Sequence, residues 1–289
     1  MPELVDKIVL GTVQLGMDYG VTNSYGKPEK LEAIKILETA WEGGIRRFDT
    51  APGYGSEEIL GEFIKINGIQ NEVKVLTKIP SLKNKKNYQL SIKSSLEESL
   101  DKLKSKIEVL FFHDSEDSEL LVSDEIFFKN IRINYPIKSL GVSVYAPNDV
   151  EPTLISKLDL ACQFPANILD RRFEKNIFPL GKRYCRSIFL QGILVSNNIS
   201  KKNTKSEVIQ LQKEYHSLLS IEKIDPLQIA ISYIYKNDFC DFFLIGTEKE
   251  SQLKNILAID TKILFEENES FISFSKKVKK KWLDPRNWT

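Results

Sequence analysis

The hydrophobic positions of this chain fall into two alternating patterns. Short apolar runs rich in β-branched and aromatic residues are separated by longer stretches in which apolar residues return every three or four positions. The short runs predict strands and the longer stretches predict helices. The eight predicted strands are Lys7–Thr12, Arg46–Thr50, Lys74–Ile79, Glu108–His113, Lys138–Val144, Leu160–Phe164, Ser187–Gln191 and Phe242–Gly246. The clearest predicted helices are Glu29–Glu42, Glu57–Ile66, Leu90–Leu103 and Glu207–Leu219.

Strands that alternate with helices predict a parallel sheet, because parallel neighbours need a crossover connection. Eight strand–helix units of roughly thirty residues favour a closed (β/α)8 TIM barrel over an open doubly wound sheet. A dinucleotide-binding doubly wound domain normally carries Gly-x-Gly-x-x-Gly after its first strand. The first predicted strand is followed here by Gly11-Thr-Val-Gln-Leu-Gly16, which lacks that pattern. We therefore predict an α/β protein with a single barrel domain over residues 1–269.

The composition agrees with a globular protein that has a sizeable core. Of the 289 residues, 42% are hydrophobic, and 41 basic side chains nearly balance 40 acidic ones. The charge is unevenly distributed, because residues 270–289 carry six basic side chains and one acidic side chain. We expect these residues to form a basic C-terminal tail. A mildly acidic body with such a tail is not typical of nucleic-acid-binding proteins, so we expect no nucleic-acid partner and keep a nucleic-acid-binding tail only as an alternative.

The sequence contains neither a membrane-spanning run nor an export signal. No apolar run approaches the roughly 18 to 20 residues that cross a bilayer, and the first residues lack a basic region followed by an apolar one. We therefore expect a cytoplasmic protein without a membrane partner.

Cys162, Cys185 and Cys240 lie among apolar residues without metal-ligand spacing, which predicts reduced, mostly buried thiols. With only two histidines, His113 and a surface His216, we expect no metal site.

Polar side chains occur at the ends of the predicted strands, where barrels of this kind place their chemistry. They are Asp49, Thr50, Lys78, His113, Ser143 and Gln163. Because the carboxyl ends of all the strands surround one mouth, we expect these side chains to converge. Tyr54 follows Asp49 by five residues in a turn-rich loop that could bring its phenol over the same mouth.

An aspartate, a lysine, a tyrosine and a histidine in one mouth predict a proton-transfer site. A tyrosine at its ordinary pKa of about 10 is a poor acid at neutral pH, and a neighbouring ammonium favours the ionised form. Asp49 would keep Lys78 charged and oriented, since a lone buried ammonium is costly. His113 could donate a hydrogen bond to a carbonyl oxygen. Structural roles stay open for each residue: an ion pair at the barrel mouth, an exposed loop aromatic at Tyr54 and a core histidine.

Five segments of the chain resemble the aldo-keto reductases. They are Ile8-Val-Leu-Gly-Thr12, Gly43-Gly-Ile-Arg-Arg-Phe-Asp-Thr-Ala-Pro-Gly-Tyr-Gly-Ser56-Glu-Glu-Ile-Leu-Gly61, Val75-Leu-Thr-Lys78, Val109-Leu-Phe-Phe-His113 and Leu140-Gly-Val-Ser143. The resemblance implies a barrel that reduces aldehydes or ketones with NAD(P)H. It implies Tyr54 as the proton donor, with Asp49, Lys78 and His113 around it. We expect a small-molecule carbonyl substrate and a monomer or homodimer.

The same resemblance implies a nicotinamide cofactor extended across the barrel mouth. The implied contacts are Gly11, Thr12, Asp49, Ser143, Gln163, Gly192, Ser196, Gly246, Thr247 and Gln252. Ser143 and Gln163 match positions that bind the nicotinamide carboxamide, and Asn167 matches an asparagine that usually follows the glutamine. On the nicotinamide side, two positions depart from the family pattern. Val144 replaces an asparagine, and the tyrosine that stacks on the nicotinamide is missing, which leaves Phe189 as a candidate ring with core packing as its alternative.

At the phosphate end, the segment Gly192–Ser196 matches the loop that covers the pyrophosphate. The backbone of Gly246–Thr247 opens a predicted helix, which suits an anion. Gln252 occupies a position where NADPH-preferring members usually carry an arginine. The Glu248 carboxylate would oppose a 2′-phosphate, while Lys249 would partly offset it. We expect NADP as the cofactor and keep NAD as an open alternative.

The substrate is less visible in the sequence. The polar, aromatic loop Met17–Gly26 suits a hydroxylated substrate and resembles a bacterial subgroup associated with sugar or polysaccharide synthesis, which suggests a sugar-derived carbonyl compound; a surface loop is the alternative. The tail, with Trp282 and Trp288, could bend over the cleft or could be a solvated end. A catalytically weak, nucleotide-binding, redox-sensing regulatory subunit is kept as the alternative function.

Overall fold

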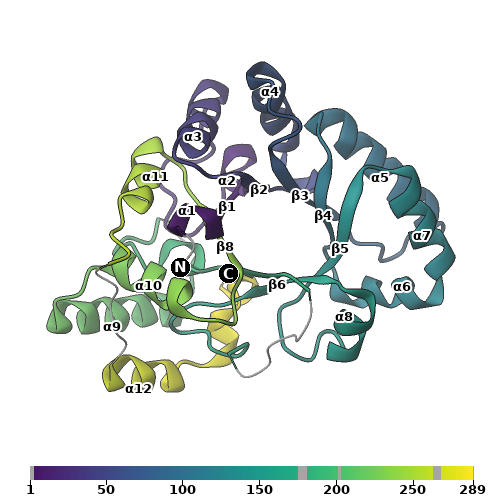
Figure 1. The fold of residues 1–289 in the computed structure, drawn as a ribbon. Coiled ribbons are helices and arrows are strands. Elements are labelled where there is room, and N and C mark those ends of the chain that lie inside the picture. The colour runs from purple at the N-terminus through teal and green to yellow at the C-terminus, as the bar shows by residue number, and fades with distance from the viewer. Residues whose placement is uncertain (1–2, 175–180, 201–202, 263–267, 289) are drawn as a thin grey trace.

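The computed structural model describes residues 3–174, 181–200, 203–262 and 268–288, and its centre is a closed barrel of parallel strands (Figure 1). The strands follow one another around the barrel in chain order, and pairing between the last and the first closes it. Their bounds are β1 Ile8–Gly11, β2 Arg47–Asp49, β3 Lys74–Ile79, β4 Ile107–Phe112, β5 Ile137–Ser143, β6 Ala161–Pro165, β7 Arg183–Arg186 and β8 Phe242–Gly246. The predicted (β/α)8 TIM barrel is confirmed.

Helices surround the ring of strands (Figure 1). The longer ones are α3 Lys30–Glu42, α4 Glu57–Asn67, α5 Tyr88–Leu103, α7 Glu125–Asn134, α9 Ser206–Glu222, α10 Pro226–Lys236, α11 Glu250–Leu257 and α12 Glu269–Lys277. Short helices and 3-10 turns are α1 Leu4–Lys7, α2 Val13–Gly16, η1 Pro52–Tyr54, η2 Ser115–Glu119, α6 Leu120–Ser123, α8 Pro152–Leu158, η3 Leu190–Gly192, η4 Lys280–Leu283 and η5 Pro285–Asn287. The four predicted helices are confirmed, and their ends lie within three residues of the predicted ones.

One predicted strand is wrong. Seven strands lie within one residue of their predicted bounds, but β7 is Arg183–Arg186 rather than Ser187–Gln191. Ser187, Leu190 and Gln191 have left-handed backbone conformations, with φ of 60°, 45° and 50°, which a strand cannot contain. The apolar run therefore forms a loop and a 3-10 turn. The hydrophobic pattern did not predict the true strand because its first and last residues are arginines.

The barrel has an inner and an outer apolar layer. Strand residues that face the axis form the inner cluster, which consists of Val9, Leu76, Val109, Phe111, Ala161 and Tyr184. The outer layer packs the strands against helix faces such as Ala33, Ile36, Leu37 and Ala40 of α3, whose spacing is that of one helix face. Gly141 makes room for an inner aromatic side chain, because a Cβ there would come within 2.6 Å of the Phe111 ring. The closed inner layer makes the two ends of the barrel separate environments.

The C-terminal residues 270–288 pack against the barrel domain and are not a solvated end. Trp288 is fully buried and Trp282 is 7% exposed. The Trp288 indole donates to the carbonyl of Trp282 at 3.0 Å, and the Trp288 carbonyl accepts from the backbone amide of Lys205 at 2.9 Å. These contacts anchor the segment beside the start of α9.

The three cysteines are buried and free, as predicted. In the described ranges, no helix has both the length and the apolar character needed to cross a bilayer.

Candidate active site

A cavity of about 650 Å³ opens at the carboxyl ends of the strands. The four predicted catalytic residues Asp49, Tyr54, Lys78 and His113 all line it. So do the predicted cofactor contacts Gly11, Ser143, Gln163, Gly192, Ser196, Gly246, Thr247 and Gln252. The structure therefore brings together residues that are spread over more than two hundred positions of the chain.

Thr12 is the exception among the predicted contacts, because it does not line the cavity. Its side chain is fully buried and its hydroxyl donates to the backbone carbonyl of Asp49 at 3.0 Å. The Thr12 hydroxyl oxygen also lies 2.8 Å from the hydroxyl oxygen of Ser56. Thr12 thus ties β1 to β2 and to the following loop, which is a packing role that its strand-end position did not distinguish from a binding role.

Asp49 and Lys78 form a buried ion pair at the cavity floor. Each is 3% exposed, and the Lys78 ammonium donates to both Asp49 carboxylate oxygens at 2.7 and 2.9 Å and to the Thr50 carbonyl at 2.9 Å. The Gln163 amide donates to the same carboxylate at 2.9 Å. Burial acts most strongly on Lys78 and lowers the pKa of its ammonium, but Asp49 and Tyr54 outweigh it, and the pKa is raised overall. Lys78 is therefore held as a cation.

Tyr54 is brought over this pair by a tightly held loop. It ends the 3-10 turn η1, and the Lys78 Nζ lies 5.1 Å from its ring centroid. The buried Ser56 hydroxyl lies 3.0 Å from the Thr50 hydroxyl, which fixes the end of the loop. Gly16 packs so closely beneath it that a Cβ would lie 2.0 Å from the Tyr54 carbonyl oxygen. Tyr54 is thus a positioned cavity residue rather than an exposed loop aromatic.

His113 borders the cavity with a partly exposed ring and is not a core histidine. Its Nδ1 lies 3.2 Å from a carboxylate oxygen of Asp114. A carboxylate can only accept, so Nδ1 carries the hydrogen in this contact. The other ring nitrogen accepts hydrogen bonds when the ring is neutral and donates them when the ring is doubly protonated.

The predicted nicotinamide side of the cavity has two polar atoms without protein partners in the described chain. The Ser143 hydroxyl lines the cavity and makes no hydrogen bond there, and Gln163 has its carbonyl oxygen free after its amide is used by Asp49. Together they offer a donor and an acceptor to a carboxamide. Phe189 lines the cavity and also packs against the core, so both of its predicted roles are compatible with its position.

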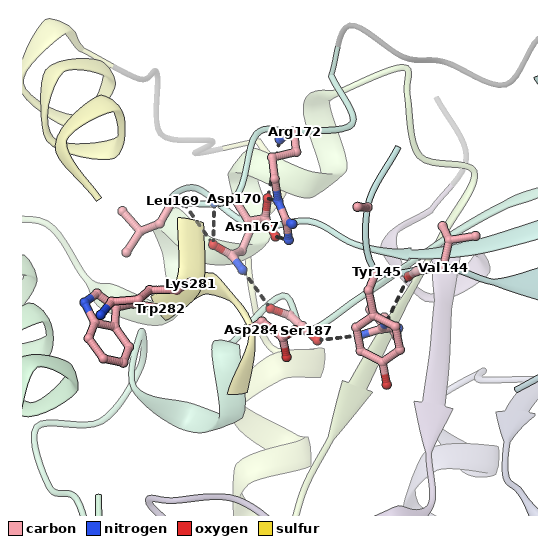
Figure 2. A network of polar contacts seen from close by, with 12 residues as sticks. Val144, Tyr145, Asn167, Leu169, Asp170, Arg172, Ser187, Lys281, Trp282 and Asp284 are labelled. Atoms are coloured by element: carbon pink, nitrogen blue, oxygen red, sulfur yellow. Dashed lines mark hydrogen bonds and ion pairs between the residues drawn. The ribbon is translucent and has the colours of Figure 1, made fainter. Parts of the chain in front are cut away.

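Asn167 does not reach the cavity. Its amide donates to the Ser187 carbonyl at 3.1 Å, and its side-chain oxygen accepts from the backbone amides of Leu169 and Asp170 at 3.0 and 2.9 Å (Figure 2). The side chain shapes the turn that follows β6 and holds it to the end of β7. Its match to a family asparagine therefore corresponds to a structural role in this chain.

At the predicted phosphate end, two buried polar atoms have no hydrogen-bond partner among the described residues: the hydroxyl of Thr247 and the side-chain oxygen of Gln14. Both residues line the cavity, and Thr247 is 2% exposed. Gln252 is used differently. Its side-chain oxygen accepts from the backbone amides of Glu248 and Lys249, and its amide donates to the Glu248 carboxylate at 2.9 Å. It therefore caps α11 and holds a negative charge at the cavity wall.

The loop Met17–Gly26 forms part of the cavity wall and is not a loop that merely packs at the surface. The Thr22 hydroxyl donates to the Gln191 carbonyl at 3.2 Å, which joins this loop to the turn after β7. The Lys249 Nζ lies 3.1 Å from the centroid of the Tyr25 ring, which joins it to the turn after β8. The loop thus spans part of the mouth between two segments that are distant in sequence.

A model of the aldo/keto reductase family matches residues 7–269. The chain belongs to this family. It is 24% identical to the aldo-keto reductase YhdN of Bacillus subtilis (strain 168), over 92% of this chain and 88% of that protein. An alignment that covers 38% of this chain and 43% of D-threo-aldose 1-dehydrogenase of Pseudomonas sp shows 29% identity.

The solved structure of the glycerol dehydrogenase AKR11B4 from Gluconobacter oxydans shares the fold. It superposes with a TM-score of 0.65 at 19% identity, covering 97% of this chain and 92% of that one. Membership of the family makes the protein an NAD(P)H-dependent oxidoreductase, with carbonyl reduction as its general chemistry.

Several residues that line the cavity of this aldo/keto reductase were not recognised from the sequence, among them Gln14, Tyr145 and Arg186. Arg186 is the last residue of β7. Because this strand was predicted at Ser187–Gln191, Arg186 was not recognised as a strand-end residue. Its guanidinium donates to the Val144 carbonyl at 2.9 Å and lies 4.2 Å from the Tyr145 ring centroid. Arg286 of the C-terminal segment also lies over that ring, at 3.5 Å. The tail therefore supports a wall residue, although none of residues 270–288 lines the cavity itself.

Proposed function

We propose that this protein reduces an aldehyde or ketone to an alcohol, with the proton supplied by Tyr54 and the hydride by NADPH. The observation that carries the proposal is the buried Asp49–Lys78 pair beneath the Tyr54 phenol. A carbonyl oxygen above Tyr54 would receive the phenolic proton as negative charge develops on it. The Lys78 cation would stabilise the charge left on the phenol oxygen.

Asp49 and His113 have different roles in this proposal. Asp49 keeps Lys78 charged and fixed, since the carboxylate accepts two hydrogen bonds from the Lys78 ammonium and the Thr50 carbonyl accepts a third. His113, at the cavity edge and bonded to Asp114, orients the substrate oxygen. A direct hydrogen bond from His113 to that oxygen requires the doubly protonated ring.

The cavity suits a nicotinamide dinucleotide. The free Ser143 hydroxyl and Gln163 oxygen would hold the carboxamide, and the unpaired Thr247 hydroxyl and Gln14 oxygen lie at the phosphate end. A buried hydroxyl without a partner is costly unless a ligand or water satisfies it. When bound, the cofactor supplies the hydride.

We propose NADPH as the preferred form, with Lys249 as a cation that offsets the opposing charge of Glu248 at the predicted 2′-phosphate. Glu248→Gln is expected to lower the Kd of NADPH about five-fold, on the order of 1 kcal/mol, because it removes one carboxylate near a dianion. The Kd of NADH should change less than about two-fold. Glutamine can still accept the hydrogen bond from Gln252, so the helix cap is kept.

The matched control is Glu250→Gln. The Glu250 carboxylate is bonded by Lys35 and Lys254 and does not line the cavity. Titrations of both nucleotides with both variants check the assignment. An equal effect of Glu248→Gln on the two nucleotides would show that Glu248 does not face the 2′ position.

We further propose a sugar-derived carbonyl compound as the substrate. The loop Met17–Gly26 places hydroxyl and phenol groups in the wall, including Tyr19, Thr22 and Ser24, which suit a hydroxylated substrate. The partial match to D-threo-aldose 1-dehydrogenase, whose name specifies a sugar substrate, supports this class.

The proposal is tested by following nucleotide oxidation with a panel of carbonyl compounds that includes aldoses, ketoses and aromatic aldehydes. We expect turnover with NADPH, and a higher kcat/KM for hydroxylated compounds than for apolar ones of similar reactivity. Tight nucleotide binding with no turnover on any compound would instead favour the redox-sensing regulatory subunit.

A further inference from the structure

A second cavity, of about 610 Å³, lies at the opposite end of the barrel from the active site. Five cationic side chains and three carboxylates contribute to its wall. Strand geometry explains two of the cations. Residues two or four apart on a strand share a face, so Arg47 lies below Asp49 on β2, and Lys74 lies below Lys78 on β3. Arg47 and Lys74 are register partners on adjacent strands, which places two positive charges side by side.

Neither of these two cations has a carboxylate partner in the described part of the chain. Arg47 donates to the backbone carbonyl of Asp6 at 3.1 Å, and its guanidinium lies 4.0 Å from the Phe242 ring centroid. Its Nε is buried and unpaired. Lys74 has no hydrogen bond or ion pair among the described residues. The charge of Arg47, followed by burial, lowers the pKa of Lys74, which reflects repulsion between the two groups.

The nearby acidic groups do not resolve this imbalance. Asp241 is bonded by Arg183 at 2.6 and 2.9 Å. Glu108 is shared by Lys138 at 3.0 Å and Lys182 at 3.5 Å. Asp6 and Asp238 also line the cavity, but both are exposed to solvent at its edge. The Glu108 carboxylate attracts both Arg47 and Lys74, but in the described ranges no carboxylate forms an ion pair with either cation.

A third group without a partner among the described residues lies near Arg47 but does not line the cavity. The hydroxyl of Tyr184 is fully buried and unpaired, and it interacts electrostatically with Arg47 at this end of the barrel. Tyr184 stacks on Phe242, the ring over which Arg47 also lies. The unpaired nitrogen and the unpaired hydroxyl are thus associated with one aromatic side chain beside the cavity.

We propose that this second cavity binds a phosphate dianion through Arg47 and Lys74. A phosphate offers several acceptor oxygens, so it can accept hydrogen bonds from the Arg47 guanidinium and the Lys74 ammonium together and offset the repulsion between them. The group could come from inorganic phosphate or from a small phosphomonoester, because both present the same dianion. The site is separate from the active site, and its existence does not depend on the proposed reaction.

The test is calorimetric titration of the full-length protein with inorganic phosphate and with glycerol phosphate, at constant ionic strength set by chloride. We expect saturable binding that becomes about ten-fold weaker in Lys74→Gln and in Arg47→Gln, because each removes one charge-assisted contact. Lys138→Gln is the matched control, since it removes a cation of the same barrel end that is already bonded to Glu108. It should bind phosphate with wild-type affinity.

A further variant separates this site from the phosphate end of the active site. Thr247→Val alters the active-site cavity alone and should leave phosphate affinity unchanged. Loss of binding in Thr247→Val, with retention in Lys74→Gln and Arg47→Gln, would overturn the proposal. So would the absence of saturable binding in the wild type. Equal affinity for both ligands assigns inorganic phosphate, and tighter binding of glycerol phosphate assigns a phosphomonoester.

If Arg47→Gln does not fold, the thermal unfolding of Lys74→Gln with and without phosphate tests the proposal. In phosphate-free buffer this variant should unfold at the wild-type temperature or above it, because it relieves repulsion between two cations. In saturating phosphate the wild type should gain thermal stability and the variant should gain less. An equal phosphate-dependent gain in both proteins would also overturn the proposal.

Discussion

Replacing Tyr54 by phenylalanine is expected to lower kcat by roughly 10² to 10⁴-fold, the usual contribution of a positioned general acid. The phenylalanine ring keeps the contact with the Lys78 ammonium, which lies 5.1 Å from the ring centroid in the wild type. Only the hydroxyl is lost. The Kd of the nucleotide should therefore change less than about two-fold, and the loss should appear in the chemical step.

Single-turnover rates across a pH series, together with nucleotide titrations, check this expectation. Tyr135→Phe is the control, because the Tyr135 hydroxyl bonds to Glu97 away from the cavity. If Tyr54→Phe keeps wild-type rates throughout the pH series, another group donates the proton and the proposed mechanism is wrong.

The second large effect concerns stability. Asp49→Ala is expected to reduce the free energy of unfolding by about 3–5 kcal/mol, because it leaves the Lys78 ammonium buried without its counter-charge. The remaining Thr50 carbonyl accepts one hydrogen bond but supplies no negative charge. Urea denaturation of the wild type and the variant measures the difference.

The double variant Asp49→Leu with Lys78→Met should recover most of this loss, since it removes both charges and fills a similar volume. It should be inactive, which separates the stability of the pair from its function. A double variant as unstable as Asp49→Ala would show that the cost lies in packing rather than in the unpaired charge. Asp101→Ala, which breaks an exposed pair with Lys104, should change stability little.

The pH dependence of this pair has a definite sign. The pKa of Lys78 is raised in the folded protein, so the unfolded chain loses this proton at a lower pH. The stabilising contribution of Lys78 is therefore fully present below its unfolded value of about 10.4, and it is lost as the pH rises through the folded value.

Most of the fold could be predicted because strand and helix periods are local properties. Seven of eight strands follow from their apolar runs. The failure at β7 is also physical, because the run Ser187–Gln191 is apolar and yet its backbone turns left-handed at three positions. An apolar run shows that residues are buried, and it does not distinguish a buried strand from a buried turn.

The central site residues were predictable for a related reason. Parallel strands in a barrel end on the same side, so polar residues at strand ends meet without any knowledge of side-chain contacts. This reasoning found Asp49, Lys78 and Gln163, which are joined by hydrogen bonds. It did not distinguish Thr12 from the residues that line the cavity. Thr12 lies at a strand end, but its side chain packs inward against Ser56.

The sequence by itself determined the barrel, the family and the four residues proposed to be catalytic. The alternation of strand and helix patterns, the strand ends and the motifs are local properties of the sequence. Only the tertiary structure decided that Asn167 shapes a turn, that Arg186 lines the cavity and that Gln252 caps a helix. It alone revealed that Arg47 and Lys74 lie side by side and that no carboxylate in the described part of the chain forms an ion pair with either. The physical reason is that a side chain's role depends on which partners lie within hydrogen-bonding distance, and those partners come from distant parts of the chain.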